Sequence, residues 1–196
     1  MKYILASKSP RRREILENLG IRFEIVTAET DESDSETNPC LLVERLAARK
    51  GEAVRQLLKA EGHPLDDETV IISSDTVVSV DGKILGKPQN REDAYRMLKL
   101  LSGRAHQVVS GISLIGKNVC AATHEVTDVE FDALDEETLD RYLSTNEPYD
   151  KAGAYAIQGL ASVWISGIRG CYFNVVGLPV HRLNTLHRRL FGKNFL

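Results

Sequence analysis

Three consecutive arginines stand where a helix is expected to begin. Arg11-Arg12-Arg13 follow a short apolar run and the segment Ser7-Lys8-Ser9-Pro10, in which Ser9 suits an N-cap and Pro10 the first helical position. Cations are unfavourable in a first turn, because its dipole end is positive and its N–H groups lack partners. A bound phosphate would remove this conflict. The pattern therefore favours a phosphate site, and the alternative is that the arginines are solvated or pair with Glu14 and Glu17.

Two charged residues interrupt apolar patterns further along the chain. Lys50 falls on the apolar stripe of a predicted helix, where a lysine either extends to solvent or serves a ligand. Asp75 follows the buried run Val70-Ile71-Ile72, and ligands gather beyond the carboxyl ends of strands. Its carboxylate can hold a metal or activate water, or it can simply cap a turn. Thr76 adds a hydroxyl group beside it.

Two polar segments supply further candidates. Residues 29–36 form an acidic loop in which Asp31, Glu32 and Asp34 offer oxygen ligands for a hard cation, although such loops are commonly just solvated. Residues 147–159 mix charges, glycines and an amide in a way that no regular element requires. Gln158 in this segment has a donor and an acceptor with which to contact the edge of a base, or it braces the loop.

The helices and strands expected along the chain must position these residues. Their order predicts an α/β protein with a mixed sheet flanked by helices. The hydrophobic periodicity and turn residues also predict a hairpin at Asp81-Gly82 and a β pair, residues 163–168 with 172–176, turning at Gly170. The other strands are expected at residues 3–6, 21–25, 70–72, 108–115 and 126–131. The helices are expected at residues 10–19, 39–61 and 91–101, after Asp135 and from Pro179.

The composition limits the kind of protein. The 196 residues, 42% hydrophobic and 27% charged, suit one folded domain over residues 1–196, either compact or divided into two lobes. A net charge of −3 argues against a nucleic-acid partner. No apolar run approaches the roughly 20 residues that cross a bilayer, so we expect a cytoplasmic protein with no membrane partner. Cys40, Cys120 and Cys171 are expected to be free thiols.

Six ordered motifs give the chain a resemblance to the Maf family of nucleoside triphosphate pyrophosphatases, also called septum-formation inhibitors. The resemblance covers essentially the whole chain. The motifs are Leu5-Ala6-Ser7-Lys8-Ser9-Pro10-Arg11-Arg12, Ser74-Asp75-Thr76-Val77-Val78, Gly86-Lys87-Pro88, Leu101-Ser102-Gly103-Arg104-Ala105-His106, Glu147-Pro148-Tyr149-Asp150-Lys151-Ala152-Gly153-Ala154-Tyr155 and Asn174-Val175-Val176-Gly177-Leu178-Pro179.

The resemblance implies an elongated, bilobed mixed-sheet fold with the active site in the cleft between the lobes, and commonly a homodimer. It implies a nucleoside triphosphate diphosphatase, a hydrolase that uses Mg²⁺ or Mn²⁺ to cleave between the α- and β-phosphates and release a monophosphate and pyrophosphate. Asp75 would be the proton acceptor, and Glu32 and Asp75 would lie at the metal. The positions that would hold the triphosphate are Ser7, Arg11, Arg12, Lys50 and Lys87.

Within the family, the run Ala154-Tyr155-Ala156-Ile157-Gln158-Gly159 resembles the branch that acts on dTTP and UTP, a housecleaning role in nucleotide metabolism. In that branch the positions of Arg11, Thr76 and Gln158 are tied to base choice. The chain departs from the family pattern with Ser73-Ser74 where glycine-alanine is usual, and with Gly51 where alanine is usual. Gly51 is expected to weaken its helix by about 1 kcal/mol relative to alanine.

Two alternatives belong to other classes of protein. The older family name implies a non-catalytic, nucleotide-sensing regulator of septum formation, which would return its nucleotide uncut. A nucleic-acid module would rest on the arginine cluster and on a basic terminal helix with Arg182, Arg188 and Arg189. The acidic total and the lack of interleaved aromatic residues favour a solvated face for that helix.

Overall fold

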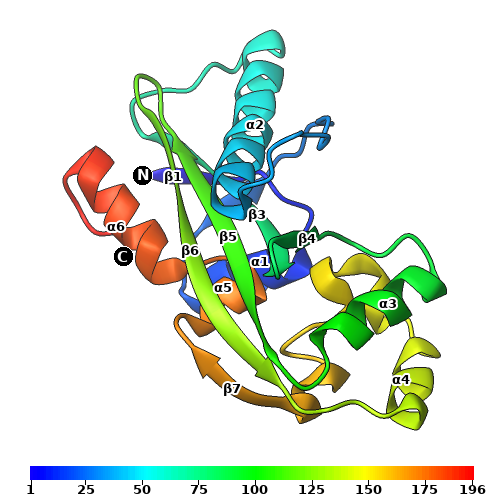
Figure 1. The fold of residues 1–196 in the computed structure, drawn as a ribbon. Coiled ribbons are helices and arrows are strands. Elements are labelled where there is room, and N and C mark those ends of the chain that lie inside the picture. Colours follow the sequence, from blue (N-terminus) through cyan, green and yellow to red (C-terminus); the bar gives the residue numbers. More distant parts are fainter.

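A computed structural model describes all residues from Met1 to Leu196 (Figure 1). Its centre is one mixed sheet of seven strands in the order β2-β1-β3-β5-β6-β7, with β4 paired to β3. Strand β1 is parallel to β2 and β3, and the other pairs are antiparallel. The predicted mixed α/β fold is confirmed. The strands are β1 (Lys2–Leu5), β2 (Phe23–Ile25), β3 (Thr69–Val80), β4 (Lys83–Leu85), β5 (Ala105–Ile115), β6 (Cys120–Phe131) and β7 (Ile165–Arg169).

One edge of β3 is open at its middle. Strand β1 pairs with the first part of β3 and stops at the Leu5–Ile72 pair, while β4 pairs only from Val78 to Val80. The residues between Ile72 and Val78 therefore pair with β5 alone. Because β1 ends where β3 continues, the chain that leaves β1 turns beside the open edge. The segment that follows β1 and the middle of β3 are in this way brought together.

Helices cover both faces of the sheet. Helix α2 (Pro39–Ala60) lies on one face, and α1 (Pro10–Asn18), α5 (Tyr172–Val176) and α6 (Val180–Phe191) lie on the other (Figure 1). Successive residues of a strand point to opposite faces. Accordingly, the Ser73 hydroxyl donates to the Ala47 carbonyl oxygen of α2 at 2.7 Å, and the Ser74 hydroxyl donates to the Gly177 carbonyl oxygen after α5 at 2.9 Å. None of the helices has both the length and the apolar character needed to cross a bilayer.

The apolar core has two larger parts. One contains Val70 and Ile72 from the first half of β3, packed with side chains of β1, α1 and α6. The other contains Val78 and Val80 from the second half, packed with α3 (Arg91–Leu101) and α4 (Glu136–Leu143), which lie at the lower right of Figure 1. The open middle of β3 thus lies between two separately packed regions.

The segment Tyr172–Val176 is a helix, so the strand predicted there is wrong. Its alternation of residue types suits a strand, but β7 already forms the sheet edge and turns away at Gly170. One helical turn instead places the Asn174 side chain against strands β5 and β6 of the sheet. Its side chain accepts from Ser110 N at 3.1 Å and donates to Val108 O and Thr127 Oγ1, both at 2.9 Å. Buried amide groups need such partners, and this demand overrides the local pattern.

Three smaller expectations also differ from the structure. The predicted strand 163–168 begins at Ile165, because residues Leu160–Trp164 form the 3₁₀ helix η3. Strand β2 contains only Phe23–Ile25, and Ile25 is exposed at the sheet edge. Ser9 precedes α1 as expected, but its side chain makes no capping bond, and its own N–H donates to Ser7 Oγ at 3.2 Å. The other predicted helices and the hairpin at Asp81-Gly82 are confirmed.

Candidate active site

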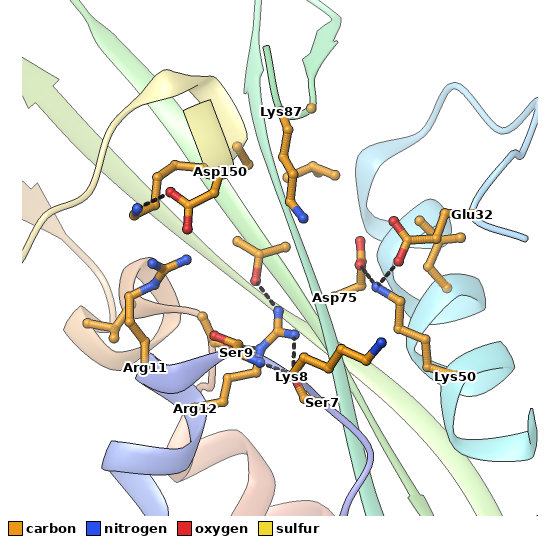
Figure 2. Close-up of a pocket in the computed structure, with 18 of the residues that line it drawn as sticks. Ser7, Lys8, Ser9, Arg11, Arg12, Glu32, Lys50, Asp75, Lys87 and Asp150 are labelled. Atoms are coloured by element: carbon orange, nitrogen blue, oxygen red, sulfur yellow. Dashed lines mark hydrogen bonds and ion pairs between the residues drawn. The ribbon is translucent and has the colours of Figure 1, made fainter. Parts of the chain in front are cut away.

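A cavity of about 880 Å³ opens along the free edge of β3 (Figure 2). Small-molecule sites commonly have volumes of 300–1,000 Å³. The segment after β1, the acidic loop, α2, the middle of β3, the turn after β4 and residues 150–158 all contribute to its wall. The residues that the family resemblance implies for the site all lie on this wall: Ser7, Arg11, Arg12, Glu32, Lys50, Asp75, Thr76, Lys87 and Gln158. Asp31 and Asp34, the other candidate cation ligands of the acidic loop, do not line the cavity.

Arg12 is held rigidly by acceptors from three parts of the chain. Its Nε donates to the Gly177 carbonyl oxygen at 2.8 Å, Nη1 to Ser7 Oγ at 3.2 Å and Nη2 to Thr76 Oγ1 at 3.1 Å. A guanidinium group has five N–H donors, so two remain for a ligand. Burial lowers the pKa of Arg12, and the charge of Asp75 opposes this shift. A buried, fixed cation of this kind is suited to a phosphate group.

Thr76 braces Arg12 through a directed chain of hydroxyl groups. Ser110 Oγ donates its only proton to the Asn174 carbonyl oxygen at 2.9 Å. In the 2.8 Å contact between Thr76 and Ser110, Thr76 must therefore be the donor. Its oxygen is left to accept from Arg12. The structure thus gives Thr76 a contact with the buried arginine, whereas the family resemblance ties its position to base choice.

The Ser7 hydroxyl is oriented in the same way. Its oxygen accepts from the backbone N–H of Ser9 and from Arg12 Nη1, both at 3.2 Å. Both lone pairs are then used, so the hydroxyl proton is free to be donated into the cavity. Ser7 is itself buried, which protects this arrangement from competing water. The residue can accordingly donate a hydrogen bond to a phosphate oxygen.

Three further cations line the cavity without any hydrogen bond or ion pair to the protein. They are Lys8, Arg11 and Lys87 (Figure 2). Lys8 belongs to the predicted phosphate segment but was not among the residues expected to hold the triphosphate. Arg13, by contrast, points away and pairs with Glu17 at 2.8 Å. The arginine cluster therefore divides into two arginines in the cavity and one on the solvated face.

Lys50 joins the two carboxylates of the site. Its Nζ lies 2.6 Å from Asp75 Oδ1 and 2.8 Å from Glu32 Oε1 (Figure 2). The side chains of Lys50 and Asp75 are 19% and 12% exposed, so their pairing is only weakly screened by water. The hydrogen bond from Lys50 holds the pKa of Glu32 below its usual range. Lys50 thus reaches the site despite the glycine that follows it.

The charges of the cavity wall favour an anionic ligand. The wall has six basic residues, Lys8, Arg11, Arg12, Lys50, Lys87 and Lys151, against four acidic ones, Glu29, Glu32, Asp75 and Asp150. The chain as a whole has a net charge of −3, so this local excess of positive charge opposes the global balance. Cationic clefts concentrate and stabilise anions. A polyphosphate is therefore the class of ligand that the cavity suits.

The acidic residues of the cavity could bind a divalent cation together with such a ligand. The protein has no group of three or more His, Cys, Asp or Glu residues arranged to hold a metal alone. Glu32 and Asp75 nevertheless approach the same Lys50 Nζ from two sides. Mg²⁺ is commonly bound through one or two carboxylates together with substrate phosphates and water. The donor set therefore fits a metal that is shared between protein and nucleotide.

The segment that carries Gln158 is fixed by Glu147, a contact that sequence reasoning missed. The Glu147 carboxylate accepts from Leu160 N at 2.9 Å, from Ala161 N at 3.4 Å and from the Tyr142 hydroxyl at 3.0 Å. A Cβ on Gly159 would lie 2.3 Å from both carboxylate oxygens, so any larger residue there would displace the Glu147 carboxylate from these contacts. Nothing periodic links these residues, and only the mixture of glycines and charges marks the segment in the sequence.

The fold and the site together define a class of protein: a mixed α/β protein with a cavity suited to a polyanion at an interrupted sheet edge, in which paired carboxylates face fixed cations. Comparison with known proteins gives the particular family. The family model described as Maf-like protein matches residues 2–190, and the chain belongs to this family.

Relatives named dTTP/UTP pyrophosphatase match this chain over nearly their full length. A dTTP/UTP pyrophosphatase of Desulforamulus reducens is 47% identical over 194 residues, which cover 96% of each chain. A dTTP/UTP pyrophosphatase of Clostridioides difficile is 48% identical over 200 residues, covering 99% of this chain and 97% of the relative. A third, from Carboxydothermus hydrogenoformans, is 48% identical over 185 residues, covering 93% and 95%.

Proposed function

We propose that this protein hydrolyses dTTP and UTP to the nucleoside monophosphate and pyrophosphate, and that it does so as a housecleaning enzyme of nucleotide metabolism. The relatives that bear this name support the proposal by their identity over almost the whole chain. One observation carries it: the carboxylate of Asp75 faces a cavity whose other walls hold fixed and unpaired cations. A protein that only sensed nucleotides would not need this carboxylate.

In this mechanism the basic wall binds the triphosphate. Arg12 and Ser7 donate their remaining N–H and O–H groups to phosphate oxygens, and Arg11, Lys50 and Lys87 neutralise the charge. Phosphoryl chemistry depends mainly on such positioning and electrostatic stabilisation. Because Arg12 is already fixed, little reorganisation is needed when the substrate binds.

Asp75 acts as the proton acceptor. Its Oδ1 is engaged by Lys50, and its Oδ2 has no protein partner, so Oδ2 is free to take a proton from the attacking water. Glu32 and Asp75 would hold Mg²⁺ or Mn²⁺ together with the phosphates. When bound, the metal supplies charge neutralisation and polarises a phosphoryl oxygen. Lys50 is the charged residue that forms an ion pair with Asp75, and this pair orients the Asp75 carboxylate.

The test is pyrophosphate release by the purified protein with Mg²⁺ or Mn²⁺ across dTTP, UTP, CTP, GTP, ATP and 7-methyl-GTP. We expect release from dTTP and UTP, and a loss of about 10²- to 10⁴-fold in kcat for Asp75→Asn with nucleotide affinity little changed. Asp67→Asn is a matched control, because Asp67 pairs with Lys117 on the surface. Tight binding with no cleavage would favour the regulator of septum formation instead.

Base choice is proposed to depend on Gln158, with contributions from Arg11 and Thr76 on the same cavity wall. Gln158 is exposed on the cavity wall and offers both a donor and an acceptor to a pyrimidine edge. In Gln158→Glu the amide donor is lost and a negative charge appears. We expect the preference for dTTP and UTP over CTP to fall about tenfold, the worth of one hydrogen bond. An unchanged ranking of the nucleotides would assign base choice to other groups.

Three further properties belong to the same proposal. A single domain, residues 1–196, with two lobes is supported by the two larger apolar clusters on either side of the open edge. A cytoplasmic location is supported by three cysteines that form no disulfide. A homodimer is supported by exposed apolar side chains beside the edge strand β7.

A further inference from the structure

Glu32 reaches the site from a segment with almost no regular support. It lies between β2 and α2, where no helix or strand is formed from Val26 to Asn38. Between residues 27 and 37 no backbone group donates to another backbone group. The Glu32 side chain is 59% exposed, so burial does not fix it either. Some other contact must hold this carboxylate 2.8 Å from Lys50 Nζ.

One arginine of α2 binds the backbone on both sides of Glu32. Arg49 Nη1 donates to the carbonyl oxygen of Asp31 at 2.7 Å and to that of Ser33 at 3.0 Å. Its Nη2 donates to Asp34 Oδ2 at 2.8 Å. The planar guanidinium group has donors in a fixed arrangement, so three acceptors on one loop are set relative to one another. The position of the intervening Glu32 follows from this.

Asp34, which accepts a hydrogen bond from Arg49, is itself fixed in position. The Asp34 side chain is only 8% exposed, and its Oδ1 accepts from the backbone N–H of Glu36 at 3.0 Å. Arg45, one turn earlier on α2, lies 3.5 Å from Asp34 Oδ1 and 3.1 Å from Glu36 Oε2. The acidic loop is therefore attached to α2 by two arginines and not merely solvated.

We propose that Arg49 is a positioning residue that sets Glu32 against Lys50 and Asp75. Arg49 and Lys50 are neighbours on one helix, so the same element places both the lysine and, through the loop, its second carboxylate partner. The inference rests on the proposed function in one respect, that Glu32 helps to hold the divalent metal. Arg49 itself does not line the cavity and touches no ligand.

The experiment compares Arg49→Ala and Arg49→Lys with a matched control, Arg55→Ala. Arg55 lies on the same helix and pairs only with Glu52, one turn before it. The first measurement is hydrogen exchange, without metal or nucleotide, at the amides of Ser33 and Glu36, which donate to the side chains of Asp31 and Asp34. We expect exchange at least about tenfold faster in Arg49→Ala and unchanged in Arg55→Ala. Arg49→Lys should behave like Arg49→Ala, because one ammonium group cannot satisfy the three acceptors together.

The second measurement is the Mg²⁺ concentration that gives half-maximal pyrophosphate release. Residues that orient a metal ligand typically affect metal affinity by 10- to 100-fold, so we expect this concentration to rise about tenfold in both Arg49 variants. Binding of dTTP without metal should stay within about twofold of the wild type, since no phosphate ligand has changed. A general loss of folding would instead weaken dTTP binding and lower the melting temperature.

A double variant tests whether Arg49 affects the Mg²⁺ requirement through Glu32. If Arg49 acts through Glu32, Arg49→Ala should add nothing to the metal requirement of Glu32→Gln. Independent, multiplying effects would overturn the proposal, as would unchanged exchange in the loop. If the wild type releases no pyrophosphate, the proposed function fails, but the exchange experiment still decides whether Arg49 positions the loop. Should Arg49→Ala not fold, Asp34→Ala removes the side-chain acceptor on the opposite side of the same contact.

Discussion

His106 is a buried histidine that takes no part in the proposed chemistry. Its Nε2 lies 2.7 Å from the Tyr155 hydroxyl, and the rings of Phe131 and Tyr155 meet it edge to face at 4.8 and 5.3 Å. Its Nδ1 has no hydrogen-bond partner. Burial disfavours the charged imidazolium and lowers the pKa of His106 from 6.5 to about 4. Protonation of His106 therefore lowers the free energy of unfolding.

The consequence is a specific acid sensitivity. Between pH 6.5 and 4 the unfolded chain binds a proton at His106 that the native protein does not bind, so the free energy of unfolding falls as the pH falls. The total loss by pH 4 should be about 3 kcal/mol. His106→Gln, which keeps a polar partner for Tyr155 but does not titrate there, should remove this part of the pH dependence.

Urea unfolding at a series of pH values measures this slope. His63→Gln is the matched control, because His63 is exposed in the loop after α2. Burial also lowers the pKa of His187, so some slope should remain in His106→Gln. Identical slopes in the wild type and His106→Gln would contradict the assignment of this effect to His106.

Site residues differ in how visible they are in the sequence. Lys50 could be predicted, because a charge within an apolar stripe is anomalous. Asp75 was expected beyond the end of a strand at residues 70–72, and this reason is wrong, because Asp75 lies within β3 and reaches the cavity only where that strand has an open edge. Arg49 and Glu147 could not be predicted. An arginine on a partly exposed helical position and a glutamate in a polar segment are ordinary, and their partners lie many residues away. Their roles depend on where irregular chain folds back, which periodicity does not encode.

At the scale of the elements, α2 and β3 meet at a pair of coupled residues. Gly51 is buried against the sheet, and a Cβ there would lie 2.7 Å from Ser73 Oγ and 2.9 Å from Ile115 Cδ1. The Ser73 hydroxyl occupies this space and donates to the Ala47 carbonyl oxygen. Glycine at 51 and serine at 73 therefore fit each other in volume. This pair sets how closely the helix carrying Lys50 approaches the sheet.

The expected outcome is a coupling in stability between the two positions. Gly51→Ala gains about 1 kcal/mol of helix propensity but crowds Ser73, at a cost of about 1–3 kcal/mol, so it should be neutral or destabilising. Ser73→Gly loses a buried hydrogen bond and should destabilise the protein by about 1–2 kcal/mol. The double variant should be more stable than the sum predicts by at least about 0.5 kcal/mol. Urea denaturation of the four proteins measures this coupling, and simple additivity would contradict it.

The helices and strands also differ in whether the sequence alone could predict them. Helices α1, α2 and α3 and the hairpin of β3 and β4 were predictable, because periodic apolar residues and turn residues agree with the tertiary structure. Helix α5 was not, since five residues are too few for a helical period to appear and the buried contacts of Asn174 decide the conformation. The open edge of β3 was also invisible, because it depends on where two partner strands stop.

At the scale of the whole molecule, one sheet edge is left uncovered and apolar. Strand β7 is the last in the sheet order, so its outer backbone groups have no strand partner. Large apolar side chains are exposed beside it, with Val163 at 77%: Leu160, Val163, Ile168, Tyr172 and Phe173. An exposed edge with apolar flanks favours association with another chain, and isologous pairing of identical surfaces is the commonest solution.

We therefore expect a homodimer formed through the β7 edge. Val163→Glu combined with Ile168→Lys places charges on this surface and should give a monomer, measured by light scattering after gel filtration. Leu41→Lys, which charges an exposed apolar residue on α2, should leave the dimer intact. Because one chain supplies every residue of the cavity wall, the monomeric variant should keep pyrophosphate release per chain within about twofold. A monomeric wild type would refute the interface, and activity that disappears on dissociation would mean that the second copy completes the site.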